Sequence, residues 1–325
     1  MSLKSTTARA RLAILLAVLS VFTPASSFSN PCTEMVTIAA RGRAKTELHE
    51  LISALPSNAE IPANVYSRFD VNDIANAIVK RVKREESQNL DVLSSPRHVK
   101  INLQRDTDIM LFFWSEDLAS INEKGFLNLH QAKKSRGIFN YSTRMQAEDI
   151  NTGLTLGASQ EALDLRPKSA LLNVRVDVGL GNRQHPVLNH FGNIAAVMKP
   201  NIRERSLWMN TDSFFLAGNG FGPPSRAELI ERRGSFDRET LPGPQVGGIS
   251  YFETFIYGKV GMKDVDYFLV FDPSLVEILK PLRKPIYLGA PRVLETFAND
   301  QFGQLSLMRR EIFEKKQLLF SGAAE

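Results

Sequence analysis

The chain has 325 residues, with 40 lysine and arginine residues, 35 aspartate and glutamate residues and a single cysteine. Hydrophobic residues make up 43% and charged residues 23% of the chain, a balance that excludes collagen-like, low-complexity and multi-span membrane proteins. One cysteine excludes an internal disulfide and a metal site built from several cysteines.

The N-terminus has the layout of a secretory signal peptide over residues 1–29. Three basic residues precede an apolar run at 12–22, and small residues follow it. This run is too short to span a bilayer comfortably, which argues against the alternative of a retained N-terminal anchor. We therefore expect export to the periplasm or the extracellular space, with no stable membrane insertion after the signal is cleaved.

Removal of the signal peptide changes the charge balance. It leaves 37 basic and 35 acidic residues, a net charge of +2. Proteins that bind nucleic acids normally gather positive charge on one face, so a nucleic-acid partner is not expected. An unknown protein target or a small molecule remains as the expected partner.

Residues 30–97 are predicted to form a helical N-terminal region. The clearest helix is expected at 71–86, where apolar residues recur at intervals of three and four. Ser94, Ser95 and Pro96 are expected to end this region.

Strand signals begin at residue 98 and predict an α+β core domain over residues 98–290. A stretch at 217–248 contains seven glycines and four prolines and is expected to be an insert in this domain. Residues 291–325 are predicted to form a C-terminal helical tail. Short helices are expected at 115–125 and 274–280, and strands at 99–103, 108–114, 169–178, 193–198, 249–257, 265–271 and 286–288.

This order of elements favours an α+β fold in which a helical preface precedes a mixed or antiparallel sheet with short helices. Glu253 is the most informative residue of the predicted sheet. Side chains alternate along a strand, so Glu253 shares a face with Tyr251, Phe255 and Tyr257. A carboxylate among aromatic rings is costly to bury without a partner. Two interpretations stay open: the face is the floor of a cleft that binds a planar ligand, or the strand lies at an edge with Glu253 in solvent.

Several segments resemble ADP-ribosyltransferase-like toxin domains. Residues 252–258 (FETFIYG) and 264–270 (DVDYFLV) resemble the last catalytic strand of that superfamily and the strand after it. Residues 113–125 are similar to its first strand and helix, and residues 139–144 (FNYSTR) to its aromatic–Ser–Thr–Ser element. The resemblance covers approximately residues 108–272.

The resemblance implies a secreted toxin or effector that transfers ADP-ribose from NAD, with NAD as substrate and no metal. Glu253 would be the catalytic residue, placing a fixed negative charge where the ribose becomes positive as nicotinamide leaves. Six further residues would bind NAD or support its site: Arg105, Arg144 or Arg166 at the phosphates, Ser142 and Thr143 beside them, and Tyr251, two positions before Glu253.

Two other functions remain open. The chain is alternatively a non-catalytic periplasmic or secreted binding protein that uses the aromatic face of residues 249–257 as its contact surface. A third interpretation is a ribonuclease-like toxin, although the sequence has no convincing cluster of histidine, lysine and arginine residues for that chemistry.

Overall fold

The computed structural model describes residues 31–85, 92–94, 100–133, 141–175, 191–209, 252–299 and 305–322. The predicted signal peptide, the glycine- and proline-rich insert at 217–248 and Tyr251 lie outside these residues. The chain divides into two compact units, residues 1–47 and 48–325. The described part of the first unit is the start of helix α2 (Pro31–Ala54).

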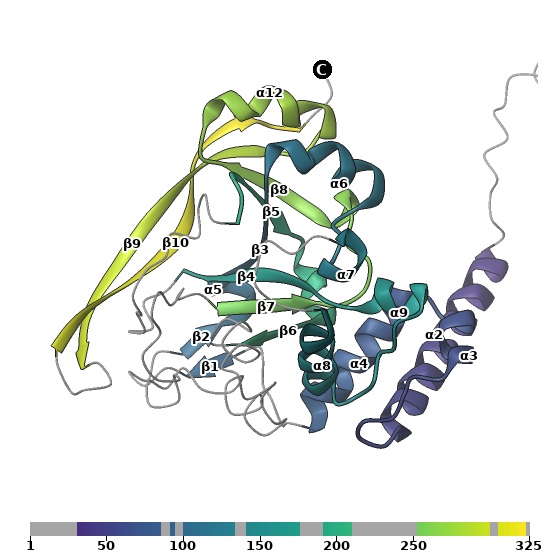
Figure 1. Cartoon of the computed structure of the whole chain (residues 1–325). Helices are drawn as coiled ribbons and strands as arrows, with labels where there is room; N and C mark the ends of the chain where they lie inside the picture. Colours follow the sequence, from purple (N-terminus) through teal and green to yellow (C-terminus); the bar gives the residue numbers. More distant parts are fainter. Residues whose placement is uncertain are drawn as a thin grey trace, which may run out of the picture. The chain divides into compact units, whose positions relative to one another are not determined.

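The second unit contains helices and a large sheet, so the fold is α+β as predicted (Figure 1). Within the described ranges, no helix combines the length and the apolar character needed to cross a bilayer. After α2, the described helical segments of the second unit are α3 (Ala63–Arg68), α4 (Val71–Glu85), α5 (Leu103–Asp106), η1 (Ser115–Asp117), α6 (Leu118–Lys124), α7 (Leu129–Ala132), α8 (Tyr141–Thr152), α9 (Gln160–Leu165), η2 (Pro200–Arg205), η4 (Met262–Asp264), η5 (Pro273–Leu275), α12 (Val276–Leu279) and η6 (Lys280–Leu282).

Helix α4 confirms the helix predicted from the apolar spacing at 71–86. Ile74, Ile78 and Val82 are fully buried, and they lie on one side of the helix because three or four residues make one turn. The prediction of helix as far as residue 97 is wrong at its end. Val92–Ser94 forms strand β1, which pairs antiparallel with β2 (Lys100–Asn102). In this pairing the backbone N–H and C=O groups of β1 bond to those of β2. The sequence pattern of so short a segment does not show that such a partner strand exists.

The main sheet has eight strands in the order β10-β9-β8-β5-β3-β4-β7-β6. Among these described strands, only β8 and β9 are parallel, so the sheet is mixed, and the other neighbouring pairs are antiparallel. The strands span β3 (Thr107–Phe113), β4 (Lys168–Val174), β5 (Ile194–Met198), β6 (Ser206–Met209), β7 (Phe252–Ile256), β8 (Val265–Val270), β9 (Ile286–Asn299) and β10 (Leu305–Phe320).

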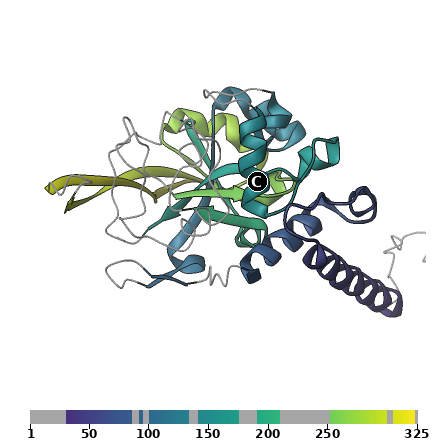
Figure 2. The ribbon, with the colours of Figure 1, turned by 60° about the horizontal axis from the view of Figure 1, so that its bottom comes forward.

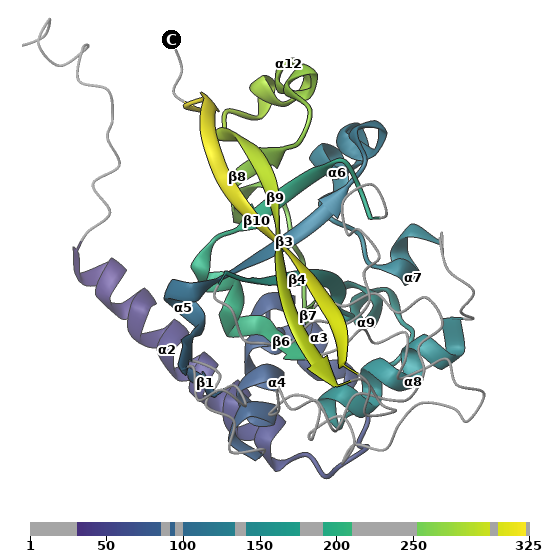
Figure 3. The ribbon, with the colours of Figure 1, turned by 90° about the vertical axis from the view of Figure 1, so that its left-hand side faces the viewer.

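Side chains of the sheet are buried on both faces. On one face, strand residues such as Ile109 and Leu172 form a core with Ile121 of α6 and Leu279 of α12. On the other face, the end formed by β6 and β7 packs against α4, which lies near α8 and α9 in Figures 1 and 3. Burial on both faces explains why β5 has a continuous apolar sequence rather than a strict alternation. Strand β7 is buried throughout as well, although Glu253 and Thr254 lie between its apolar residues.

The prediction of a helical C-terminal tail is wrong. Strands β9 and β10 form a long antiparallel pair, visible as a twisted two-stranded ribbon in Figures 2 and 3. Residues 286–288 of β9 also pair with β8, which joins the ribbon to the sheet. Pairing with distant strands therefore overrides the helix-like spacing of apolar residues in this segment.

Candidate functional site

Glu253 lies in the middle of β7, between β4 and β6. The register places it opposite Leu171 and Met209, both buried, and Glu253 itself is 1% exposed. The alternative in which Glu253 faces solvent from an edge strand is therefore wrong. A carboxylate at such a position requires a charged or hydrogen-bonding partner, because burial of an isolated charge is costly.

Arg144 of α8 is the cation that approaches Glu253. Its Nη2 lies 3.7 Å from Oε1 of Glu253, and its Nε lies 3.5 Å from Oε1 of Glu148. Nη2 also donates a hydrogen bond to the hydroxyl of Ser169 on β4. The guanidinium carbon lies 5.4 Å from the ring centre of Phe255, within the range of a cation–π contact. Arg144 therefore connects the helix to the catalytic strand predicted from the resemblance.

Glu148 links this pair to a second arginine. Its Oε2 lies 2.9 Å from Nη1 of Arg166 and 3.1 Å from Nε2 of His130. Arg166 is fully buried, and its Nη2 lies 3.2 Å from Oδ1 of Asp149. It also donates from Nε and Nη2 to the carbonyl of Gly157. We refer to the residues joined in this way as the buried charge cluster: His130, Arg144, Glu148, Asp149, Arg166 and Glu253.

The buried charge cluster contains more acidic than basic side chains when His130 is left aside. Three carboxylates, of Glu148, Asp149 and Glu253, face two guanidinium groups. Burial raises the pKa of Asp149, an effect that outweighs the attraction of Arg166. The raised pKa favours the neutral form of Asp149, which reduces the surplus of negative charge in the cluster.

Local structure explains how these side chains meet. Arg144 and Glu148 are four residues apart on α8, so both extend from one side of that helix. Helix α9 begins at the N-cap Ser159 and ends before Arg166, which leads into β4. Asn128 fixes this end of the helix because its side-chain amide donates to the carbonyls of Leu163 and Arg166.

The structure brings together three of the predicted site residues, Glu253, Arg144 and Arg166. Arg105 is not among them: its side chain is 76% exposed and pairs with the adjacent Asp106. The prediction that Arg105 holds a phosphate beside Glu253 therefore lacks support. Ser142 is exposed in the first turn of α8, and Thr143 follows it in that helix.

The sequence offered His130 only as a possible substitute for a residue that holds NAD, and it did not place Glu148, Asp149 or Ser169 at the site. The spacing between Arg144 and Glu148 is the one local signal, because opposite charges four residues apart commonly pair on a helix. Asp149 follows Glu148 on the same helix, whereas His130 comes from α7 and Ser169 from β4. In the described part of the chain, no three His, Cys, Asp or Glu side chains are grouped as metal ligands.

A second buried cation lies at the start of β4. Lys168 is 4% exposed, and its Nζ donates a 2.6 Å hydrogen bond to the carbonyl of Gly258. Burial, together with the nearby charge of Arg205, lowers the pKa of Lys168 to about 7. The side chain is therefore held as a partly neutral amine at neutral pH.

Replacing Lys168 with methionine is expected to remove a pH dependence of stability. The folded chain releases this proton near pH 7, whereas the unfolded chain holds it up to the ordinary pKa of 10.5. Unfolding therefore takes up a proton between these values. The free energy of unfolding of the parent should rise relative to that of the variant by about 1.4 kcal/mol per pH unit.

Urea unfolding of the parent and Lys168→Met from pH 7 upward measures this difference. Lys80→Met is the matched control because Lys80 is exposed on α4. Equal pH slopes for all three chains would show that the amine of Lys168 titrates normally.

Comparison of the chain with family models, with curated proteins and with solved structures gives no match. The functional argument therefore depends on the chemistry of the site and on the residue resemblance described above.

Proposed function

We propose that the chain is an ADP-ribosyltransferase-like enzyme that acts on NAD, with Glu253 as its catalytic carboxylate. The observation that carries this proposal is the buried pair of Glu253 and Arg144, 3.7 Å apart, beside the ring of Phe255. The carboxylate of Glu253 matches the positive ribose, and the cation of Arg144 matches the anionic pyrophosphate of a dinucleotide. The residue resemblance of β7 supports the same assignment.

The reaction requires a fixed negative charge beside the ribose. The bond between ribose C1′ and the nicotinamide nitrogen breaks, and its electron pair leaves with neutral nicotinamide. Positive charge then develops on C1′ and the ring oxygen, where the carboxylate of Glu253 stabilises it. A nucleophile of the target, or water, forms the new bond to C1′ and loses a proton.

Arg144 would hold the pyrophosphate. In the unliganded chain it pairs with Glu253 and Glu148, and at 16% side-chain exposure it is the most accessible of the three. Binding of the pyrophosphate to Arg144 would weaken its pairing with Glu253 and free that carboxylate to face the ribose. Arg166 would act indirectly, because it is fully buried and holds Glu148 in place.

The buried charge cluster is better explained by function than by stability. Replacing buried ion pairs with well-packed apolar residues is often neutral or stabilising, so their presence is weak evidence for a structural role. Clusters of interacting ionisable groups in buried surroundings are typical of functional sites. The proposed enzyme would be exported by residues 1–29 and act in the periplasm or outside the cell.

Incubation of the purified protein with NAD tests the proposal. Two labels, on the nicotinamide and on the adenylate part, separate nicotinamide release from transfer of ADP-ribose to components of a cell lysate. We expect release of nicotinamide, and labelled macromolecules if a target is present. Absence of nicotinamide release, with and without lysate, would contradict the proposal.

The structure adds one observation in favour of the ribonuclease-like alternative. His130 and Arg166 both contact Glu148, and a histidine, a carboxylate and an arginine are suited to proton transfer at a phosphodiester. Labelled RNA in the same assay tests it. The binding-protein alternative is weakened because Phe255 and Tyr257, which it requires at the surface, are 2% and 0% exposed.

A further inference from the structure

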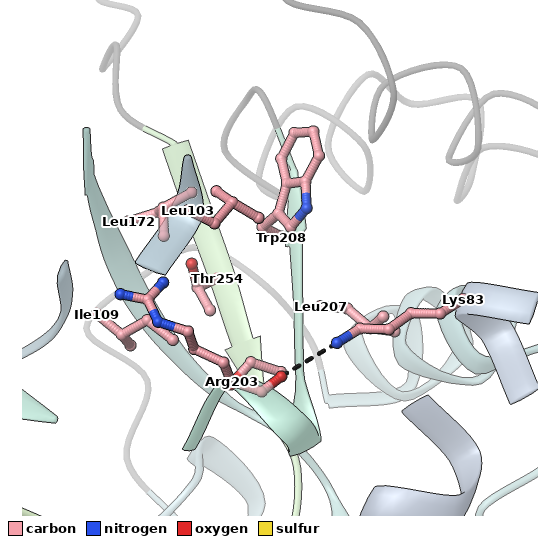
Figure 4. A pocket seen from close by; sticks show the side chains of 9 residues that line it. Lys83, Leu103, Ile109, Leu172, Arg203, Leu207, Trp208 and Thr254 are labelled. Carbon is pink, nitrogen blue, oxygen red and sulfur yellow. Dashed lines mark hydrogen bonds between the residues drawn. The ribbon is translucent and has the colours of Figure 1, made fainter. Parts of the chain in front are cut away.

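Figure 4 shows a small pocket beside β7. This pocket lies on the face of β7 opposite Glu253. Thr254 contributes to it, and neighbouring residues of a strand face opposite sides of the sheet. The volume of the pocket is about 30 Å³, space for roughly two water molecules.

Within the described residues, the hydroxyl of Thr254 has no hydrogen-bond partner, although Thr254 is 1% exposed. Its neighbours on the same face of β7 are Phe252 and Ile256, both buried in the apolar core. A valine would fill this position without desolvating a hydroxyl. Buried polar groups that lack a protein partner are rare in folded proteins, and many of them bind a water molecule or an ion. The hydroxyl of Thr254 is therefore a candidate contact for a small ligand.

Two cationic side chains reach the pocket from different elements. Lys83 extends from α4, and its Nζ donates a 3.2 Å hydrogen bond to the carbonyl of Arg203 in η2 (Figure 4). The guanidinium of Arg203 donates to the hydroxyl of Thr107 at 2.8 Å and to its carbonyl at 2.6 Å. These bonds hold the two cationic side chains in fixed positions beside the pocket.

The rest of the lining is largely apolar. Leu103, Ile109, Leu172 and Leu207 contribute aliphatic side chains, and Trp208 of β6 contributes an indole ring (Figure 4). A phosphate group fits such a lining poorly, because a doubly charged and strongly hydrated anion would lose its water against hydrocarbon. A cation would be repelled by Lys83 and Arg203.

We propose that this pocket binds a short aliphatic carboxylate. The carboxylate would accept a hydrogen bond from the hydroxyl of Thr254 and be attracted by Lys83 and Arg203. Its alkyl part would contact the leucine side chains and Trp208. Because the pocket has space for roughly two water molecules, only the carboxylate group of the ligand would be fully enclosed. This inference does not depend on the proposed function, because the pocket lies on the other face of β7.

Titration of the full chain with propionate tests the inference. Binding is measured by calorimetry and by tryptophan fluorescence. The propionate concentration is raised to roughly 100 mM, because so small a ligand binds weakly. Sodium chloride holds the ionic strength constant, and propanamide serves as a neutral ligand of similar shape. Saturable binding of propionate, at least tenfold tighter than that of propanamide, is expected.

Three variants locate the binding. Thr254→Val removes only the hydroxyl and should weaken propionate binding about tenfold, without lowering the midpoint of thermal unfolding. Lys83→Met should weaken it similarly, whereas the exposed Lys80→Met on the same helix should leave it unchanged. If propionate does not bind, or binds Thr254→Val as tightly as the parent, the inference is overturned. Inorganic phosphate that binds more tightly than propionate would also overturn it.

Discussion

Glu253→Gln is expected to lower the rate of NAD cleavage by about 100- to 1000-fold, as is typical when one group that stabilises transition-state charge is removed. Glutamine has almost the same shape as glutamate, so the packing against Leu171 and Met209 is kept. The variant loses the negative charge that would face the positive ribose. It should therefore still bind NAD while losing turnover, so that kcat falls far more than KM rises.

The matched control for this variant is Glu277→Gln. The side chain of Glu277 is 75% exposed and pairs with Lys280 on the surface, so this substitution should leave turnover unchanged. Thermal unfolding of both variants checks that they are folded. A folded Glu253→Gln protein with full NAD-cleaving activity would rule out the assignment of Glu253.

Arg166→Met is expected to cause the largest loss of stability. The guanidinium of Arg166 is fully buried and contacts both Glu148 and Asp149, so its removal leaves two carboxylates without this cation. Removal of one partner of a buried ion pair typically lowers the free energy of unfolding by about 3–5 kcal/mol, because the remaining charge stays desolvated. The carbonyl of Gly157 also loses its hydrogen bonds from this side chain.

Urea unfolding of Arg166→Met beside Arg292→Met measures this cost. Arg292 forms a 3.1 Å ion pair with Glu314 on the surface, where the two side chains are 53% and 43% exposed. Its removal should change the free energy of unfolding by less than about 1 kcal/mol. A similarly small effect for Arg166→Met would show that the buried charge cluster adds little to folding. A double variant, Arg166→Met with Glu148→Gln, should recover part of the loss.

The strands of the sheet centre were predictable because their own residues carry the signal. β5, β7 and β8 lie within predicted strand segments, and β3 begins one residue before its predicted segment. β3, β5 and β8 each contain several apolar residues in succession. Helix α4 was predictable for the same reason, since its buried residues repeat at the helical period. In these elements local pattern and tertiary environment agree.

The C-terminal strands were not predictable in this way. Leu305, Met308, Ile312 and Leu319 fit a helical spacing, whereas in the structure Ile312 and its neighbour Phe313 are both buried. Strand β10 is determined by pairing with β9, and β9 by pairing with β8. Such information lies in contacts between distant residues, not in a local window.

The candidate site also has features that the local sequence predicts and features that it does not. The alternation along β7 correctly placed Glu253 on one face with Phe255, and Arg144 and Arg166 were among the arginines predicted to hold phosphates. Sequence spacing did not show that Arg166 reaches Glu148 from the end of a different helix, or that Arg105 points away to Asp106. Both facts depend on how α8, α9 and β4 pack together.

The order of strands in the sheet also has a consequence for how the chain acquires its structure. Strand β7 lies between β4 and β6, yet β4 ends at Val174 and β7 begins only at Phe252. Until β7 has been synthesised, β4 and β6 lack the strand that joins them, and each keeps an unpaired edge. Pairing between such distant segments is slow, because a long loop must close before the contacts stabilise it. The half-formed sheet should therefore be the species most prone to aggregate, and chaperones that shield strand edges should raise the yield of folded protein.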